Sequence, residues 1–294
     1  MTRRGSSATR MALVRARLEL PTVRRAVGHT DGHHSSILTG HGIDFDDQVD
    51  YRPGDDVSSI DWKSSARAGH PIIRRFERES DVFTQLVLDT GRDMLAAAPS
   101  RERKSDIALW ASDVLAYLGS HRGDRLGLVW GDAGANHALP ARHGRDHVEF
   151  LLASAEIAYE NASAPSDVAG LLARALTVTR QRSLMILVTD EAWPKDSDMI
   201  RRVRSRHELF AVRIGDMPMT EGGVDQMVDI GTGEIVPAYV RGDRVLARHV
   251  QHQREGAAET ARRLLQDCGV HHATISSSDE VVPLLVDVLR RRRG

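Results

Sequence analysis

Cysteine and aromatic residues are scarce in this chain of 294 residues, and both shortages exclude classes of function. The single cysteine, Cys268, excludes an intramolecular disulfide and any zinc or iron–sulfur site that needs several cysteine ligands. Aromatic residues make up 4% of the chain, so the sequence offers no row of rings on which single-stranded nucleic acid could stack. Because the formal net charge is only −1, we expect no nucleic-acid partner.

Long apolar runs are also missing. No stretch approaches the roughly 20 apolar residues that span a bilayer, and the basic N-terminus has no uninterrupted signal-peptide core. We therefore predict a cytoplasmic location. The arginine-rich ends of the chain would allow a peripheral membrane contact, but a solvated tail explains them more simply.

Apolar segments alternate with amphipathic ones after residue 80. The predicted strands cover residues 83–88, 126–130, 184–189, 209–214 and 272–275. The predicted helices cover residues 103–121, 145–158, 166–179, 196–206, 248–267 and 281–293, and a hairpin is expected at 229–235. Continuous apolar strands separated by amphipathic helices favour an α/β fold with a doubly wound, mostly parallel sheet.

Residues 1–80 have a different pattern. A helical spacing of apolar residues covers 11–26, and turn signals alternate with short β-like runs from residue 43 onward. We therefore predict two domains: an irregular, β-containing N-terminal region at 1–80 and an α/β domain at 81–294.

Carboxylates follow three of the apolar strands, at Asp89, Asp190 and Asp216. Because parallel strands end at one edge of a sheet, these groups should converge there. Magnesium, with manganese as the alternative, would relieve their repulsion, and the hydroxyl of Ser166 could add an oxygen ligand. The alternative interpretation is that the aspartates cap helices or turns, which we favour for Asp216.

Several motifs in order resemble the signature of the Domain of Unknown Function 58 family. They are YRPGDD at 51–56, IDWK at 60–63, AR at 66–67, FERE at 76–79, LVLDT at 86–90 and SLMILVTDE at 183–191. The resemblance covers roughly residues 40–290. It implies a von Willebrand factor A-like domain; many members of the family also have two N-terminal transmembrane helices, which this sequence lacks.

The resemblance also implies a metal-ion-dependent adhesion site, written Asp-x-Ser-x-Ser with a Thr and an Asp from later loops. Asp89, Gly91 and Asp93 occupy the three motif positions, Ser166 falls near the Thr, and Asp190 on the later Asp. Gly91 has no side-chain oxygen and Asp93 adds a charge, so the site is degenerate. Arg92, which lies between them, could replace the metal ion through a salt bridge.

For function, the resemblance implies a non-enzymatic adaptor or chaperone that acts with a MoxR-type AAA+ ATPase on a client that the sequence does not identify. The alternative is a phosphohydrolase or nuclease dependent on magnesium or manganese. In that interpretation Asp89, Asp93 and Asp190 hold the ion that activates water.

The segment from residue 51 to 79, here called the signature block, has two interpretations. Its charged residues form either a network that pins the N-terminal region onto the sheet, which we favour, or a surface for a partner. We interpret Trp62 as a packing anchor. The residues that would contact a partner are Tyr51, Asp55, Asp56, Asp61, Trp62, Lys63 and Arg67.

Overall fold

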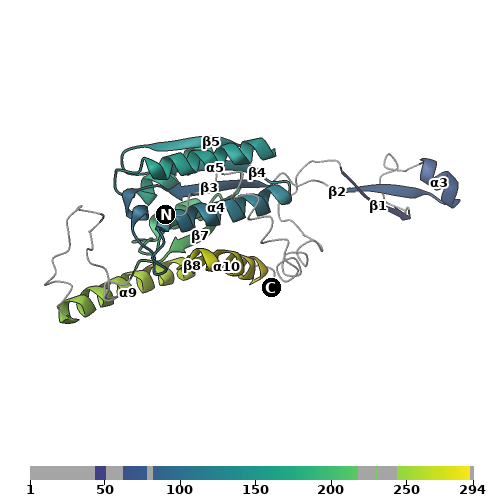
Figure 1. The fold of residues 1–294 in the computed structure, drawn as a ribbon. Helices are drawn as coiled ribbons and strands as arrows, with labels where there is room; N and C mark the ends of the chain where they lie inside the picture. Colours follow the sequence, from purple (N-terminus) through teal and green to yellow (C-terminus); the bar gives the residue numbers. More distant parts are fainter. Residues whose placement is uncertain (1–43, 51–61, 78–81, 218–229, 231–243, 292–294) are drawn as a thin grey trace. The chain divides into compact units, whose positions relative to one another are not determined.

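A computed structural model describes residues 44–50, 62–77, 82–217, 230 and 244–291 (Figure 1). Two compact units can be distinguished, one within residues 33–82 and the other containing residues 83–294. The helix predicted at 11–26 and the hairpin at 229–235 lie outside the described residues. The division into 1–80 and 81–294 stays a prediction, because the residues before Asp44 are not described.

The described residues of the smaller unit form a two-stranded antiparallel sheet and one short helix. Strand β1 (Asp44–Asp50) pairs with β2 (Ile72–Glu77), and helix α3 (Trp62–Ala68) precedes β2. The Oγ atom of Ser65 accepts a hydrogen bond of 2.8 Å from the backbone N–H of Ile72, which fixes the helix to the start of the strand. None of the residues of α3 is buried, so the helix lacks the apolar stripe by which a sequence predicts one.

The larger unit is an α/β domain whose six described strands form one sheet in the order β5-β4-β3-β6-β7-β8. The strands are β3 (Phe83–Asp89), β4 (Arg125–Gly131), β5 (Asn136–Arg142), β6 (Leu184–Asp190), β7 (Glu208–Ile214) and β8 (His271–Ile275). All neighbouring strands are parallel except β4 and β5. The predicted doubly wound, mostly parallel sheet is confirmed.

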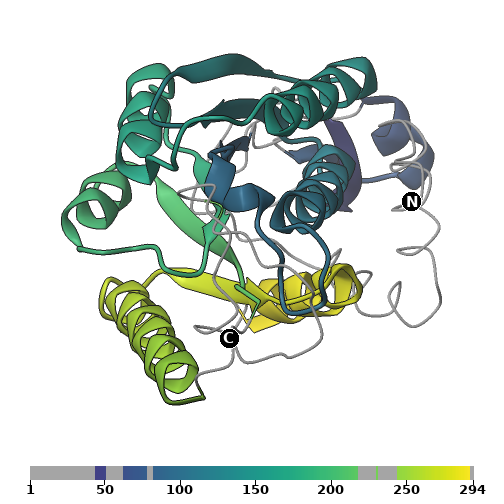
Figure 2. The ribbon, with the colours of Figure 1, turned by 60° about the vertical axis from the view of Figure 1, so that its left-hand side comes forward.

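Helices cover both faces of this sheet (Figure 1, Figure 2). One core contains residues of α4 (Lys104–His121), α5 (Arg145–Glu160) and α10 (Ser278–Arg291). The other contains residues of α6 (Val168–Val178), α7 (Asp198–Arg204) and α9 (Arg244–Asp267). Because side chains alternate along a strand, Leu86 and Leu88 of β3 enter the first core and Val87 enters the second. Among the described helices, none is long and apolar enough to cross a bilayer.

Strand β5 is an element that the sequence did not predict. It is the antiparallel edge strand of the sheet, and it contains Pro140. Proline cannot donate a ladder hydrogen bond, so it is tolerated at an edge but argues against a strand when the sequence is read alone. The C-terminal ends of β3, β6 and β7 lie side by side, as the sequence predicted. Leu88 of β3 pairs with Val188 of β6, and Asp190 of β6 pairs with Ile214 of β7.

Candidate functional site at the strand ends

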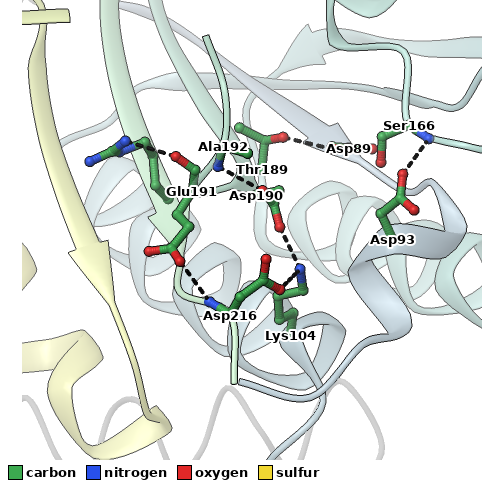
Figure 3. Close-up of polar contacts among 10 residues, drawn as sticks. Asp89, Asp93, Lys104, Ser166, Thr189, Asp190, Glu191, Ala192 and Asp216 are labelled. Atoms are coloured by element: carbon green, nitrogen blue, oxygen red, sulfur yellow. Dashed lines mark hydrogen bonds and ion pairs between the residues drawn. The ribbon is translucent and has the colours of Figure 1, made fainter. Parts of the chain in front are cut away.

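The carboxylates predicted to converge do lie at one edge of the sheet (Figure 3). Asp89 is the last residue of β3, Asp190 is the last residue of β6, and Asp216 follows β7 by two residues. Asp93 lies in a short 3-10 helix, η2 (Arg92–Leu95), just after β3. Ser166 lies in the segment before α6. These side chains have different partners, and the partners decide what the edge can do.

Asp89 is the most buried of these acids, with 1% of its surface exposed. Its Oδ1 accepts a hydrogen bond of 3.0 Å from the backbone N–H of Gly91, and its Oδ2 accepts one of 2.7 Å from the hydroxyl of Thr189. Burial raises the pKa of Asp89; the interactions with Thr189, Gly91 and Ser166 oppose that rise, and the charge of Asp190 adds to it. Both oxygens of Asp89 therefore already have protein donors.

The loop before α6 packs tightly against the end of β3. The backbone N–H of Ser166 donates to Oδ2 of Asp93 at 3.1 Å, and the backbone N–H of Arg92 donates to the carbonyl of Ala164 at 2.8 Å. A Cβ atom on Gly91 would lie 2.4 Å from Oγ and 2.5 Å from N of Ser166. Position 91 therefore admits only glycine in this arrangement, which explains why it departs from the serine of the adhesion motif.

Lys104 is the residue at this edge that the sequence analysis missed. Its ammonium group forms ion pairs with Oδ2 of Asp190 and, at 2.6 Å, with Oδ1 of Asp216 (Figure 3). Burial lowers the pKa of Lys104, but the charges of the two carboxylates outweigh burial, so the pKa is raised. The capping interpretation of Asp216 is wrong in this respect, because its carboxylate contacts a buried cation. The sequence held one hint of the role of Lys104, because this residue is one of only three lysines in the chain.

Further polar contacts extend the cluster toward β7. The second oxygen of Asp190 accepts a hydrogen bond of 2.7 Å from the backbone N–H of Ala192, and the Glu191 side chain accepts one of 3.2 Å from the backbone N–H of Asp216. The guanidinium of Arg213 donates to the backbone carbonyl of Glu191 at 2.9 Å. Burial raises the pKa of the Glu191 carboxyl, partly opposed by the hydrogen bond from Asp216.

The predicted metal ligands do not form one set. Asp89, Asp93 and Ser166 lie together, whereas Asp190 is held by Lys104 and by the backbone of Ala192. The Oγ atom of Ser166 is buried beside Asp89 and makes no hydrogen bond of regular geometry, so its oxygen suits a cation. Within the described ranges, no group of three His, Cys, Asp or Glu residues is placed to hold a metal ion. These residues do not fit the octahedral oxygen cage that magnesium requires.

The interaction residues predicted in the signature block are only partly described. Trp62, Lys63 and Arg67 lie on α3 and are exposed; Tyr51, Asp55, Asp56 and Asp61 lie outside the described residues. The interpretation of Trp62 as a packing anchor is wrong, because 70% of its surface is exposed. Burial was inferred from the apolar area of the side chain, but the structure places that area in contact with water.

Comparison with known sequences decides the family. Residues 47–259 match the family described as Protein of unknown function DUF58. The chain belongs to this family. An uncharacterised protein of Mycobacterium tuberculosis is 27% identical to this DUF58 chain over 290 residues, which cover 94% of the chain and 88% of that protein. The resemblance on which the sequence analysis relied is thus confirmed.

Two solved structures are similar to this DUF58 chain at low sequence identity. An aerotolerance-related membrane protein from Bacteroides fragilis NCTC 9343 is 12% identical, with a TM-score of 0.47, and the match covers 71% of this chain and 99% of that one. The VWA domain of SpRpn10 is 13% identical, with a TM-score of 0.36, covering 71% and 94%. The fold assignment rests on the strand order and register of the chain itself.

Hydrogen bonds and ion pairs within the domain thus engage Asp89 and Asp190 on both of their oxygens.

Proposed function

We propose that the chain is a non-enzymatic interaction adaptor that acts with a MoxR-type AAA+ ATPase, and that α3 of the signature block contacts this partner. The observation that supports this most is the 70% exposure of Trp62. Exposing a tryptophan to water is unfavourable for an isolated protein, and tryptophan is among the residues that contribute most to binding when a partner covers them.

The surroundings of Trp62 suit a partner surface that combines apolar and acidic groups. Lys63 and Arg67 are exposed on the same short helix, and Ser65 ties the helix to β2 through the backbone of Ile72. A tethered helix loses little conformational freedom on binding, which favours affinity. The basic side chains would favour an acidic surface on the ATPase and would increase the rate of encounter.

The metal-dependent phosphohydrolase or nuclease is supported less well. That function needs Asp89, Asp93 and Asp190 to share one ion, but Asp190 is paired with Lys104. A general base also needs an oxygen within reach of water, whereas Asp89 is buried and accepts two internal hydrogen bonds.

Co-purification with the MoxR-type ATPase of the same organism tests the proposal. The tagged chain should retain the ATPase in at least one of its two nucleotide states, bound to ADP or to a non-hydrolysable ATP analogue. Absence of capture in both states would contradict it. Turnover of a phosphate ester with magnesium or manganese that disappears in Asp89→Ala would favour the hydrolase instead.

A further inference from the structure

Lys104 joins three parts of the α/β domain. It is the first residue of α4, and its backbone N–H donates to the carbonyl of Ala96 at 2.9 Å. Its Nζ contacts Asp190 at the end of β6 and Asp216 just beyond β7 (Figure 3). Only 2% of the side chain is exposed. The ammonium group is therefore enclosed between two carboxylates at the strand ends.

The two carboxylates require a cation between them. Asp190 and Asp216 each direct an oxygen at the same nitrogen atom, so without a positive charge two anions would face each other in a largely buried place. A divalent ion or an ammonium group can supply the charge.

The choice of lysine here is informative. Only three of the 40 lysine and arginine residues are lysines, so arginine is the usual basic residue of this chain. A guanidinium is a planar fork that pairs with one carboxylate through two nitrogens, whereas an ammonium is a compact charge that can be shared between two acids. Of the two side chains, lysine therefore resembles a metal ion more closely.

The rest of the predicted metal site, around Asp89 and Gly91, is obstructed for a different reason. At position 91, the backbone and hydroxyl of Ser166 occupy the space that a serine side chain would need. Asp89 accepts hydrogen bonds from Gly91 and Thr189 on its two oxygens. The hydroxyl of the motif's first serine is therefore missing at Gly91, and the carboxylate of Asp89 already accepts two hydrogen bonds.

We propose that the ammonium group of Lys104 is the resident cation of this sheet edge, where it occupies Asp190, one of the residues predicted to bind a divalent metal ion. The strand ends are then held together by a charge that belongs to the chain and cannot dissociate. For the adaptor, and here the inference rests on the proposed function, it follows that capture of the ATPase needs no divalent ion at this edge.

The test is a metal titration of the isolated protein. Calorimetry with magnesium and manganese chloride should show no binding to the wild type, and thermal unfolding should be the same in either metal and in EDTA. Lys104→Ala should unfold at a lower temperature. Because it leaves Asp190 and Asp216 facing each other, it should gain metal binding, which raises its unfolding midpoint by about 5–10 °C when the metal is near 100 times its dissociation constant.

Two control variants test whether the gained metal response arises at the Lys104 cluster. Lys195→Ala removes an exposed lysine and should neither lower the midpoint nor create a metal response. Adding Asp216→Asn to Lys104→Ala should abolish the gained response. Should Lys104→Ala not fold, Lys104→Met combined with Asp190→Asn and Asp216→Asn removes all three charges together; this variant should fold and ignore metal.

Three outcomes would overturn the proposal. They are metal binding by the wild type that is lost in Asp190→Asn, a folded Lys104→Ala that does not respond to metal, and metal binding by the triple variant. None of these measurements involves the ATPase, so failure of the cation assignment can be told apart from failure of the adaptor function.

Discussion

The carboxylate of Asp216 lies 2.6 Å from the ammonium nitrogen of Lys104, although 112 residues separate the two in the sequence. Asp190 contacts the same nitrogen, so one buried cation connects the start of α4 with the ends of two strands. A buried pair of this kind contributes little when compared with an apolar core, but removing one partner is costly, because the charges left behind remain buried.

We therefore expect Lys104→Met to lower the free energy of unfolding by about 3–5 kcal/mol. Lys195→Met, at an exposed position, should change it by less than about 0.5 kcal/mol. Urea unfolding of both variants measures the difference. Adding Asp190→Asn and Asp216→Asn to Lys104→Met should recover most of the loss; if the losses simply add, the three residues do not act as one charged cluster.

The contact between Gly91 and Ser166 predicts opposite effects for the same substitution at two glycines. Gly91→Ala should destabilise the protein by about 1–3 kcal/mol, because its new Cβ atom overlaps the Ser166 backbone. Gly256→Ala, within α9 and with open space around the site, should stabilise it by up to about 1 kcal/mol. Equal effects of the two substitutions in chemical denaturation would show that Ser166 moves away without cost.

The raised pKa of Asp89 predicts how stability changes with pH. Its carboxyl binds a proton more tightly when folded, so its contribution is complete below the unfolded pKa and is lost as pH rises through the folded pKa. Asp89→Asn stays neutral, and its amide can still accept from Gly91 and donate to the Thr189 hydroxyl. From about pH 4 upward, the wild type should therefore lose stability relative to Asp89→Asn until the carboxyl is ionised.

Denaturant unfolding of both proteins across that pH range measures the gap between them. Above the folded pKa of Asp89, Asp89→Asn should be at least as stable as the wild type. If the stability of the wild type minus that of Asp89→Asn stays constant or rises with pH, the carboxyl of Asp89 does not bind its proton more tightly in the folded state.

The exposed tryptophan predicts a defect in binding without a defect in folding. Trp62→Ala should weaken capture of the ATPase by about 2 kcal/mol, which is roughly 30-fold in the dissociation constant. Phe150→Ala, on α5, removes another aromatic ring that is more than half exposed and should leave capture unchanged. Surface plasmon resonance with each variant gives the two constants. Equal weakening by both substitutions would point to nonspecific hydrophobic adhesion.

The sequence predicted those parts of the fold that have a local pattern. The strand that ends at Asp190 begins with an unbroken apolar run, and the strand that ends at Asp89 is apolar apart from Thr84 and Gln85. Their existence, direction and shared edge therefore followed from composition and chain order. Strand β5 contains Pro140, and α3 has no buried face, so neither has the apolar period by which strands and helices are recognised.

The candidate site was predicted less completely, because its contacts join distant positions. The partners of Lys104 lie 86 and 112 residues further along the chain, and no spacing rule connects them. The sequence shows that residue 91 is a glycine, but not that the backbone of Ser166 fills the adjacent space. Convergence of acids could be predicted from topology, whereas the cation that satisfies them could not.

The long sequence separation within the Lys104 cluster also bears on the order of folding. Loops of 86 and 112 residues must close before the ammonium group can meet Asp190 and Asp216, and both β6 and β7 must already have joined the sheet. We therefore expect the cluster to form late, after the rate-limiting barrier. Its contribution should slow unfolding and leave the refolding rate nearly unchanged, so Lys104 lengthens the lifetime of the folded domain.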